Sequence, residues 1–571
     1  MSRGTSTTLS SSAAARRAAS ELSEDDRWTV LLLEAGQRTR DSAATEQSIA
    51  GAAADNVAFQ HIDWKYAVEP QTTPLRGASP PGYAGRSYPI PRGKGLGGSN
   101  ELNFMLHVRG TPADYDRWEA LAVEAAGQSR FGNTTSYNAP GKRDGGFHFV
   151  HATKKGVRQS TARQFLIPKL ARNRPGGPAL NVDVVVGANV ARVLFETDAG
   201  EVRAVGVSVT LGPVPFFCGL SAPVLGRLLP PLHLPFFGGR GDAAGPREVR
   251  ARKEVILSAG SYETPHLLLK SGIGPAAQLR AAGVEPVVDL SGVGQRLQDH
   301  PVIMLKYGLG PQGGSAAPKT ITKLWLAYPS LALKWLLQGK GMLSSSACDV
   351  GYFGASNATY EGRPDLQIHG LYSGFLRLTD AFTDTVGDAS DYGLWAQGLN
   401  LIPTLNHPAA EGSVTLNAAN LRPGAGGDMV YGAGPPTITY EAFAHEEDLD
   451  RLVEGVRRTQ AIMAEPAMAA HEPTLLHARE IAADFGADSD DYWREYAKRF
   501  GTVLYHPTGT CRMGRDADDG AVVDAQLRVR GVRGLRVADA SVMPDVTSGN
   551  TNAPTAAIAV QMVRILRDQY A

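Results

Sequence analysis

Residues 504–514 read LYHPTGTCRMG and residues 545–554 read DVTSGNTNAP, and these two strings decide the fold. Between them, residues 534–541 read GLRVADAS. This string predicts a short buried strand from Gly534 to Ala538 that ends in the acid Asp539. Asn550 and Asn552 precede Pro554, and polar residues before a proline in the first turn indicate the start of a helix. The free N–H groups at such a helix start favour a nearby negative charge.

These strings resemble the glucose-methanol-choline (GMC) oxidoreductases, flavoenzymes that oxidise alcohols. The resemblance continues in PRGKGLGGSNELNFMLHVRG (91–110), SYETPHLLLKSGIG (261–274) and GVGQRLQDHP (292–301). It covers most of residues 28–118 and 145–571, apart from a proline-rich insertion at 212–246. The blocks HVRG (107–110) and YWREYA (492–497) are most similar to the animal glucose-dehydrogenase-like and choline-dehydrogenase-like branch.

The resemblance implies an α/β fold. An FAD-binding Rossmann-like domain, incomplete at the N-terminus, would carry an α+β substrate domain built on an antiparallel sheet. We expect the FAD-binding domain in three parts, 13–118 with the flavin loop, 181–301 with the insertion, and 500–571 with the catalytic residues. Segments 145–180 and 302–499 would form the substrate domain.

The resemblance also implies roles for individual residues. His506 would take the proton from the substrate hydroxyl as a hydride leaves for flavin N5, and Asn550 would hold the alcohol oxygen. Leu102 stands where covalent members carry the flavin-linked histidine, so non-covalent FAD is expected. No metal is expected, and His300 is interpreted as a residue that caps local structure. The expected cofactor contacts are Glu34, Arg92, Gly97, Gly98, Asn103, Val190, Asp539, Asn550 and Thr551.

The N-terminal segment departs from the family. Thr29 to Gly36 reads TVLLLEAG, which is typical of the second strand of a dinucleotide-binding unit, with Glu34 placed for a ribose hydroxyl. Residues 13–24 predict the preceding helix. The first strand and its G-x-G-x-x-G loop are absent, since Gly4 is the only glycine before Gly36. We therefore expect weak FAD binding and a parallel sheet without its central strand, with two exposed edges.

Several further segments are less regular. Residues 123–138 replace family sequence without clear periodicity, so a rearranged reading frame and a divergent paralogue both remain open. Residues 324–337 predict a buried helix and 437–442 a strand. Residues 446–464 predict an amphipathic helix with Leu449, Leu452, Val453 and Val456 on one face.

Composition excludes some classes of function. Lys plus Arg (57) equals Asp plus Glu (57), so the chain lacks the excess of positive charge typical of nucleic-acid-binding proteins. Three cysteines cannot build a disulfide framework, and a Cys511–His506 nucleophilic pair is conceivable but disfavoured. No stretch predicts a transmembrane helix or a secretory signal, and the compartment is left open. Two functions remain: an FAD-dependent alcohol or sugar oxidoreductase that passes electrons to a quinone or another acceptor, and a catalytically impaired relative that binds without flavin.

Overall fold

The computed structural model describes residues 4–10, 13–36, 63–72, 85–122, 145–155, 157–170, 181–211, 246–309, 329–341, 344, 346, 348–360, 363–371, 398–423, 429–432 and 434–571. Residues 212–245 of the insertion, the irregular segment 123–138, Cys218 and the first part of the helix expected at 324–337 lie outside these ranges.

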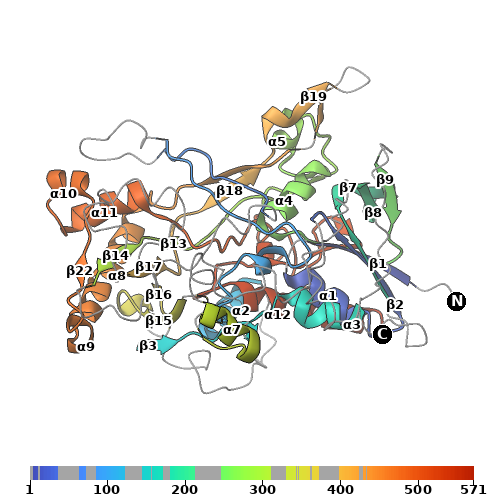
Figure 1. The fold of residues 1–571 in the computed structure, drawn as a ribbon. Coiled ribbons are helices and arrows are strands. Elements are labelled where there is room, and N and C mark those ends of the chain that lie inside the picture. Colours follow the sequence, from blue (N-terminus) through green and yellow to red (C-terminus); the bar gives the residue numbers. More distant parts are fainter. Residues whose placement is uncertain are drawn as a thin grey trace.

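A five-stranded parallel sheet organises one side of the molecule, in the order β25-β10-β1-β2-β6 (Figure 1). Helix α1 (Ala13–Leu22) links the neighbouring strands β1 and β2 and packs against the last helix, α12 (Asn552–Gln569). Leu32 and Leu33 of β2 are buried, as a continuous apolar strand covered on both faces requires. The strands are β1 (Gly4–Ser10), β2 (Trp28–Glu34), β6 (Val182–Val186), β10 (Val255–Ser258) and β25 (Leu535–Val537).

The prediction that the parallel sheet lacks its first strand is wrong. Residues Gly4–Ser10 form β1 and occupy the central position, paired with β10 on one side and β2 on the other. The segment is rich in Ser and Thr and has no apolar run, so periodicity did not indicate a buried strand. Its backbone nevertheless bonds both neighbours, and the expected pair of exposed edges does not arise.

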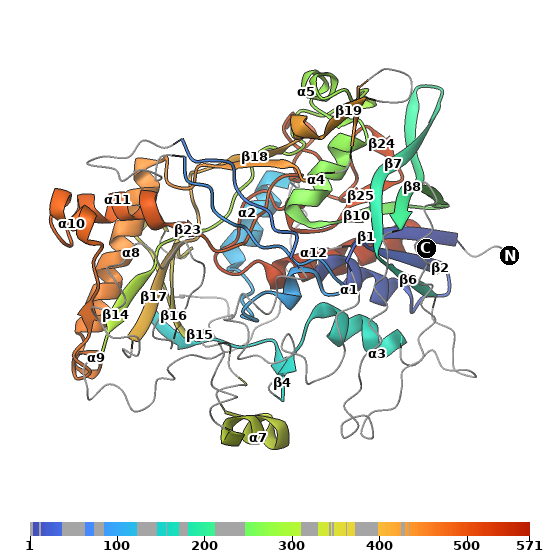
Figure 2. The ribbon, with the colours of Figure 1, turned by 45° about the horizontal axis from the view of Figure 1, so that its top comes forward.

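A second, antiparallel sheet lies on the other side of the molecule (Figure 2). Its order is β22-β14-β17-β16-β15-β3, and β13 pairs with β17 and β23. The amphipathic helix α8 (Glu446–Ala464) covers β16 and β17 with the predicted face of Leu449, Leu452, Val453 and Val456, all buried. The strands are β3 (Gly145–His148), β13 (Pro301–Val302), β14 (Leu305–Gly308), β15 (Cys348–Gly354), β16 (Leu366–Leu371), β17 (Gly398–Leu405), β22 (Thr474–Leu475) and β23 (Thr502–Val503).

A third sheet stands beside the parallel one. The antiparallel strands β7 (Ala188–Asp198), β8 (Glu201–Leu211) and β9 (Arg247–Arg250) follow each other in it, and β24 (Val532–Arg533) joins β8 in parallel. The smaller elements are η4 (Gly98–Glu101), α2 (Pro112–Ala122), β4 (Thr153–Lys154), β5 (Val157–Arg158), η5 (Ala162–Leu166), α3 (Ile167–Leu170), α4 (Gly260–Lys270), β11 (Ile273–Gly274), α5 (Ala276–Ala281), β12 (Val288–Asp289), η8 (Ala358–Tyr360), β18 (Gly412–Thr415), η11 (Ala418–Asn420), β19 (Leu421–Pro423), β20 (Met429–Tyr431), β21 (Thr437–Tyr440), α9 (Pro466–Ala469), α10 (Arg479–Phe485), α11 (Asp490–Phe500) and η12 (Ala540–Val542).

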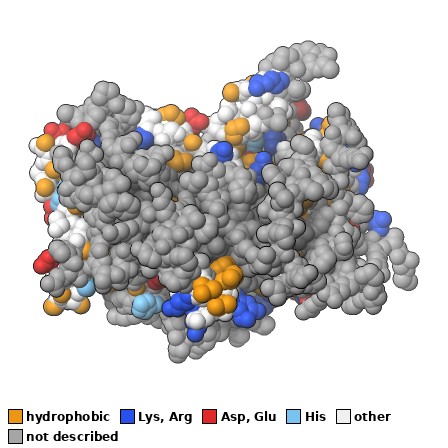
Figure 3. All heavy atoms as spheres, in the orientation of Figure 1, with side chains coloured by type: hydrophobic (Ala, Val, Ile, Leu, Met, Phe, Trp, Pro, Cys, Tyr) orange, Lys and Arg blue, Asp and Glu red, His pale blue; other side chains and the backbone are white. Residues whose placement is uncertain are grey.

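Helix α7 (Pro329–Gln338) contradicts the prediction of a buried helix. Among the side chains of α7 that the structure describes, Leu333, Leu336 and Leu337 are 55%, 61% and 72% exposed, whereas Trp335 is buried. Figure 3 shows these apolar side chains as a patch bordered by basic groups. An apolar run identifies a helix but cannot say whether other elements cover it. Among the described helices, none is both long and apolar enough to span a bilayer.

Candidate active site

His506 and Asn550 meet at the start of α12. Asn550 Nδ2 lies 3.1 Å from His506 Nε2, although the two residues come from separate loops, 504–514 and 545–551. Thr551 is the N-cap of α12, and Pro554 stands in its first turn, as the sequence predicts. The site therefore combines an imidazole, a carboxamide and the positive end of a helix.

His300 fixes the tautomer of His506. Its Nε2 lies 3.0 Å from the carbonyl oxygen of Thr547, and this contact requires an N–H donor. A neutral His300 must then accept at Nδ1, which lies 3.0 Å from His506 Nδ1. His506 consequently carries its proton on Nδ1 and presents the Nε2 lone pair to Asn550.

The pKa shifts agree with two neutral rings. Burial lowers the pKa of His300 to about 4. Burial also holds the pKa of His506 well below its usual range, and His300, His369 and Arg92 lower it further. At neutral pH, His506 is therefore unprotonated and able to accept a proton.

Asp299 holds the backbone of both histidines. Its Oδ1 accepts the N–H groups of His300 and His506, each at 2.7 Å. Burial raises the pKa of this carboxyl to about 7, although Arg92 opposes the shift. Tyr505, just before His506, has φ +63°, a left-handed conformation that costs a non-glycine residue roughly 1–3 kcal/mol. The Asp299 bonds help to maintain this strained approach to His506.

Asp114 at the start of α2 holds the other loop. Its carboxylate accepts the backbone N–H of Ser548 at 3.0 Å and the Ser548 hydroxyl at 3.0 Å. Arg363 lies 3.0 Å from the same carboxylate, and His407 Nε2 lies 2.7 Å from Ser548 Oγ. The position of Asn550, two residues later, thus depends on a buried polar network that the sequence did not indicate.

Two carboxamide oxygens at the site have no hydrogen-bond partner. Asn550 Oδ1 and Asn552 Oδ1 are both buried and unsatisfied. Buried acceptors without a donor are uncommon in native proteins and call for an explanation. A bound group that carries donors, such as a substrate hydroxyl or a flavin ring edge, fits these two positions.

The glycine-rich loop before η4 is tightly packed. A Cβ on Gly97 would lie 2.0 Å from Glu101 Oε1, and Gly98 has φ +54°, so both positions favour glycine. Arg92 lies with its guanidinium 5.4 Å from the Tyr262 ring centre. The side-chain oxygen of Asn103 accepts from Arg158 Nη1 at 2.8 Å and from a backbone N–H at 3.1 Å.

Other candidate cofactor residues have protein partners in the structure. The two oxygens of Asp539 accept four hydrogen bonds, from Gly260 N, Thr264 Oγ1, and the N and Oγ of Ser541. Asp539 thereby joins the end of β25 to the start of α4, and a cofactor contact would have to replace one of these bonds. Val190 lies on β7 and packs against the main hydrophobic core.

Glu34 ends β2 with a fully buried carboxylate. Its Oε1 accepts the N–H of Gly36 at 2.9 Å, and its Oε2 lies 2.9 Å from Arg16 Nη2 on α1. The segment before Glu34 has a strand, β1, but only Ser11 and Ser12 separate that strand from α1. No glycine occurs there, so the sequence prediction that the phosphate-binding glycines are missing still applies.

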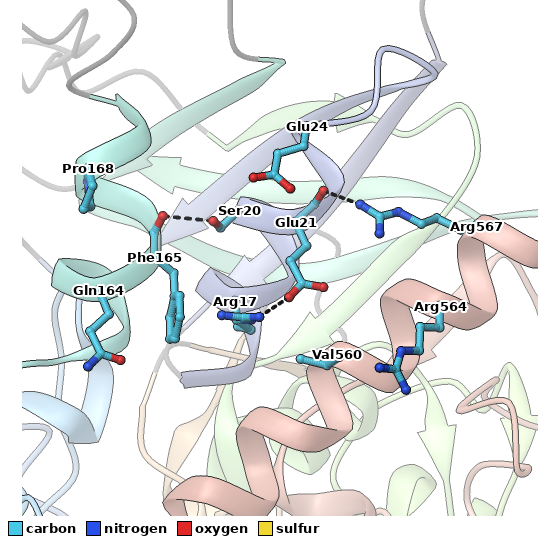
Figure 4. Close-up of a pocket in the computed structure, with 10 residues that line it drawn as sticks. All are labelled: Arg17, Ser20, Glu21, Glu24, Gln164, Phe165, Pro168, Val560, Arg564 and Arg567. Atoms are coloured by element: carbon cyan, nitrogen blue, oxygen red, sulfur yellow. Dashed lines mark hydrogen bonds and ion pairs between the residues drawn. The ribbon is translucent and has the colours of Figure 1, made fainter. Parts of the chain in front are cut away.

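A cavity of about 550 Å³ lies between α1, α12 and the η5–α3 segment (Figure 4). Arg17, Glu21, Phe165 and Arg564 are among its lining residues, and none of the predicted site residues lines it.

Cys511 is fully buried in the core, and burial raises the pKa of its thiol, which argues against a nucleophilic role. Among the described residues, no cluster of His, Cys, Asp and Glu could hold a metal.

The residues fit FAD unevenly. The unsatisfied side-chain oxygens of Asn550, which contacts His506, and of Asn552, which begins α12, fit the ring end and the substrate. The adenosine end fits poorly, because Arg16 already contacts Glu34, the carboxylate expected to bind the ribose, and the sequence before α1 lacks the glycines of a pyrophosphate loop.

Besides the network around Asp114, sequence reasoning missed the roles of His300, Asp299 and Arg16. His300 was interpreted as a cap, but its ring contacts His506, and Asp299 accepts the backbone N–H groups. Arg16 was interpreted only as part of a helix. For Arg16, the available signal in the sequence was a basic side chain next to the expected phosphate loop.

Comparisons with known proteins agree with this architecture. A model of the N-terminal GMC oxidoreductase domain matches residues 49–134 and 239–302, and a model of the C-terminal domain matches 408–559. The chain is 29% identical to an oxygen-dependent choline dehydrogenase of Pseudomonas fluorescens (strain Pf-5), over 96% of this chain and 91% of the relative. A second such enzyme, from Pseudomonas syringae pv. tomato, is also 29% identical over 96% of this chain and 90% of its own length.

Solved structures share the fold. A formate oxidase from Aspergillus oryzae aligns with a TM-score of 0.75 at 21% identity, over 100% of this chain and 99% of its own. Pyridoxine 4-oxidase from Mesorbium loti aligns with a TM-score of 0.69 at 21% identity, over 99% of both chains. Together with the matched domain models, these likenesses show that the chain belongs to the GMC oxidoreductase family, whose members are FAD-dependent oxidoreductases.

Proposed function

We propose that the chain oxidises the CH–OH group of an alcohol or sugar, with non-covalent FAD as the hydride acceptor and His506 as the base. One observation carries the proposal: His506 Nδ1 lies 3.0 Å from His300 Nδ1, and His506 Nε2 lies 3.1 Å from Asn550 Nδ2. The block at 107–110 and the string at 492–497 favour a quinone or similar acceptor for the electrons.

The protein's own residues handle the proton. A substrate hydroxyl would enter between Nε2 of His506 and the Asn550 carboxamide, replacing their mutual contact. The hydroxyl proton would pass to Nε2, while the Asn550 amide donates to the substrate oxygen. FAD, when bound, supplies the ring that takes up the hydride. The Asp299 bonds keep the His506 backbone in place throughout.

A His506→Ala variant tests the proposal. With saturating FAD, anaerobic flavin reduction by a good alcohol substrate should slow by roughly 10²–10⁴, because the general base is lost. His266→Ala is the control, since His266 is a buried histidine on α4 whose ring contacts Glu263 and Tyr431, away from His506. Reduction at the original rate in His506→Ala would exclude His506 as the base.

A second candidate is a relative that has lost firm FAD binding and acts without catalysis. The Arg16–Glu34 pair and the missing glycines favour it. A bound flavin absorbs near about 450 nm, so the spectrum of the purified chain separates the two candidates. A colourless chain that stays colourless with added FAD would support the second.

A further inference from the structure

Arg16 joins three segments, α1, β2 and the glycine-rich loop, at the place where the adenosine of FAD is expected to bind. It lies on the first turns of α1, and its Nη2 donates to Glu34 Oε2 and to the carbonyl of Gly95, both at 2.9 Å. Glu34 ends β2, and Gly95 belongs to the glycine-rich loop. The side chains of Arg16 and Glu34 are both 0% exposed. A single guanidinium therefore connects α1, β2 and the glycine-rich loop in a fully buried contact.

The backbone at the end of β2 also packs closely against the glycine-rich loop. A Cβ on Gly36 would lie 2.3 Å from Gly95 N, so the end of β2 and the glycine-rich loop are in direct contact. Ser10 at the end of β1 is the register partner of Glu34. Nucleotide ligands of such folds bind at this carboxyl edge of the parallel strands.

The spacing of the N-terminal residues places Arg16 next to the positions expected for the phosphate-binding glycines. In a dinucleotide fingerprint, the glycines of G-x-G-x-x-G precede the ribose acid by about 20 residues. Counting back from Glu34, the matching positions are Ser10, Ser12 and Ala15. Arg16 follows directly, and Ala15 is fully buried in the position that permits close helix–strand packing. The chain thus keeps the strand and the helix but replaces all three glycines and adds a cation.

We propose that Arg16 is a built-in competitor of FAD for Glu34. Its guanidinium occupies the position beside Glu34 that the adenosine ribose hydroxyls would need. It pairs the Glu34 carboxylate when no cofactor is present, and it must be displaced before FAD can bind. This inference concerns the family's cofactor and does not depend on the role of His506.

The rival assignment is a phosphate-binding arginine that helps FAD to bind in place of the missing glycines. The geometry disfavours it, because the guanidinium Nη2 is already directed at a carboxylate and a carbonyl. The two assignments make opposite predictions for removal of the charge.

An Arg16→Met variant keeps the apolar stem and removes the charge. FAD and ADP are titrated into the original chain, into Arg16→Met and into Arg17→Met by calorimetry. Arg17 is the matched control, because it is the next residue on α1, pairs with Glu21 and stacks 4.1 Å from the Phe165 ring beside the cavity between α1, α12 and the η5–α3 segment (Figure 4). We expect Arg16→Met to bind both ligands on the order of tenfold more tightly, and Arg17→Met to bind like the original chain. Unchanged or weaker binding by Arg16→Met overturns the proposal, and weaker binding supports the phosphate-binding assignment.

Thermal unfolding of the ligand-free proteins provides a second measurement if Arg16→Met folds poorly. Glu34→Gln removes the carboxylate that Arg16 contacts, and Arg16→Met removes the guanidinium that Glu34 contacts. Each single variant should lower the melting temperature more than the double variant Arg16→Met/Glu34→Gln does, because the double variant removes both charges of the buried pair together. Additive losses would overturn the proposal. Both measurements are independent of alcohol turnover, so a failure of the proposed catalytic role would leave them unaffected.

Discussion

The tautomer of His506 gives the most specific prediction about this site. His300→Ala removes the acceptor that lies 3.0 Å from His506 Nδ1. The buried N–H of His506 would lose its partner, which costs about 1–3 kcal/mol. The proton would then shift toward Nε2, the nitrogen that has to accept from the substrate. A penalty of that size corresponds to roughly 5–150-fold, so flavin reduction should slow by about one to two orders of magnitude.

Two conservative variants separate positioning from simple loss of stability. His300→Asn can place an amide oxygen near the former Nδ1, so it keeps an acceptor for His506 and should retain most of the rate. His300→Gln can place an amide N–H near the former Nε2, so it keeps the donor to Thr547 and should retain stability but lose rate.

The assay is anaerobic stopped-flow reduction of the FAD-loaded protein by an alcohol over a pH range. The tautomer can also be measured without cofactor from the ¹⁵N chemical shifts of the His506 ring. A folded His300→Ala protein with an unchanged rate and an Nδ1–H tautomer would refute the reasoning.

Further predictions concern the cofactor and pH. Because Leu102 cannot bond a flavin, acid precipitation of an FAD-loaded sample should leave all yellow colour in the supernatant, and colour in the pellet would contradict this. Burial lowers the pKa values of His300, His369 and His407 to about 4, 3 and 3, below the ordinary 6.5. Their neutral folded forms therefore contribute stability above pH 6.5 that is lost as the pH falls through these values, about 3 kcal/mol for His300 alone. The effect of Asp299 on stability has the opposite sign, since burial raises its pKa to about 7. The stability that its protonated form contributes is lost as the pH rises through that value. Urea unfolding between pH 4 and 8 (approximate limits set by these pKa values) should show the histidine loss below 6.5, and Asp299→Asn should flatten the change near 7.

Elements with a strong local pattern were predictable. The helix expected at 446–464 has those bounds in the structure, because its apolar residues recur on one face and three acids stand in its first turn. The strand expected at 437–442 forms as β21 (Thr437–Tyr440), two residues shorter. Helix α7 differs, since Leu333, Leu336 and Leu337 form an apolar run that predicts burial but lie on the surface.

The contact between His506 and Asn550 could be anticipated from two loops that flank a predicted strand and helix. The contact with His300 could not, because 206 residues separate the two rings and each local sequence has its own plausible structural role. Arg16 was missed for the same reason. A cation on an amphipathic helix normally faces solvent, and only the tertiary fold turns this one toward Glu34.

The N-terminal strand and the phosphate loop differ in how much sequence change each tolerates. A central parallel strand is needed because β2 and β10 both require backbone partners, and any extended segment of the right length can supply them. Gly4–Ser10 does so without an apolar run. A pyrophosphate site instead requires glycine at defined positions, because a side chain there prevents close approach of the backbone. The sheet therefore survives the substitutions that remove the glycines. At the position of the missing loop, the buried carboxylate of Glu34 contacts the guanidinium of Arg16, which neutralises its charge.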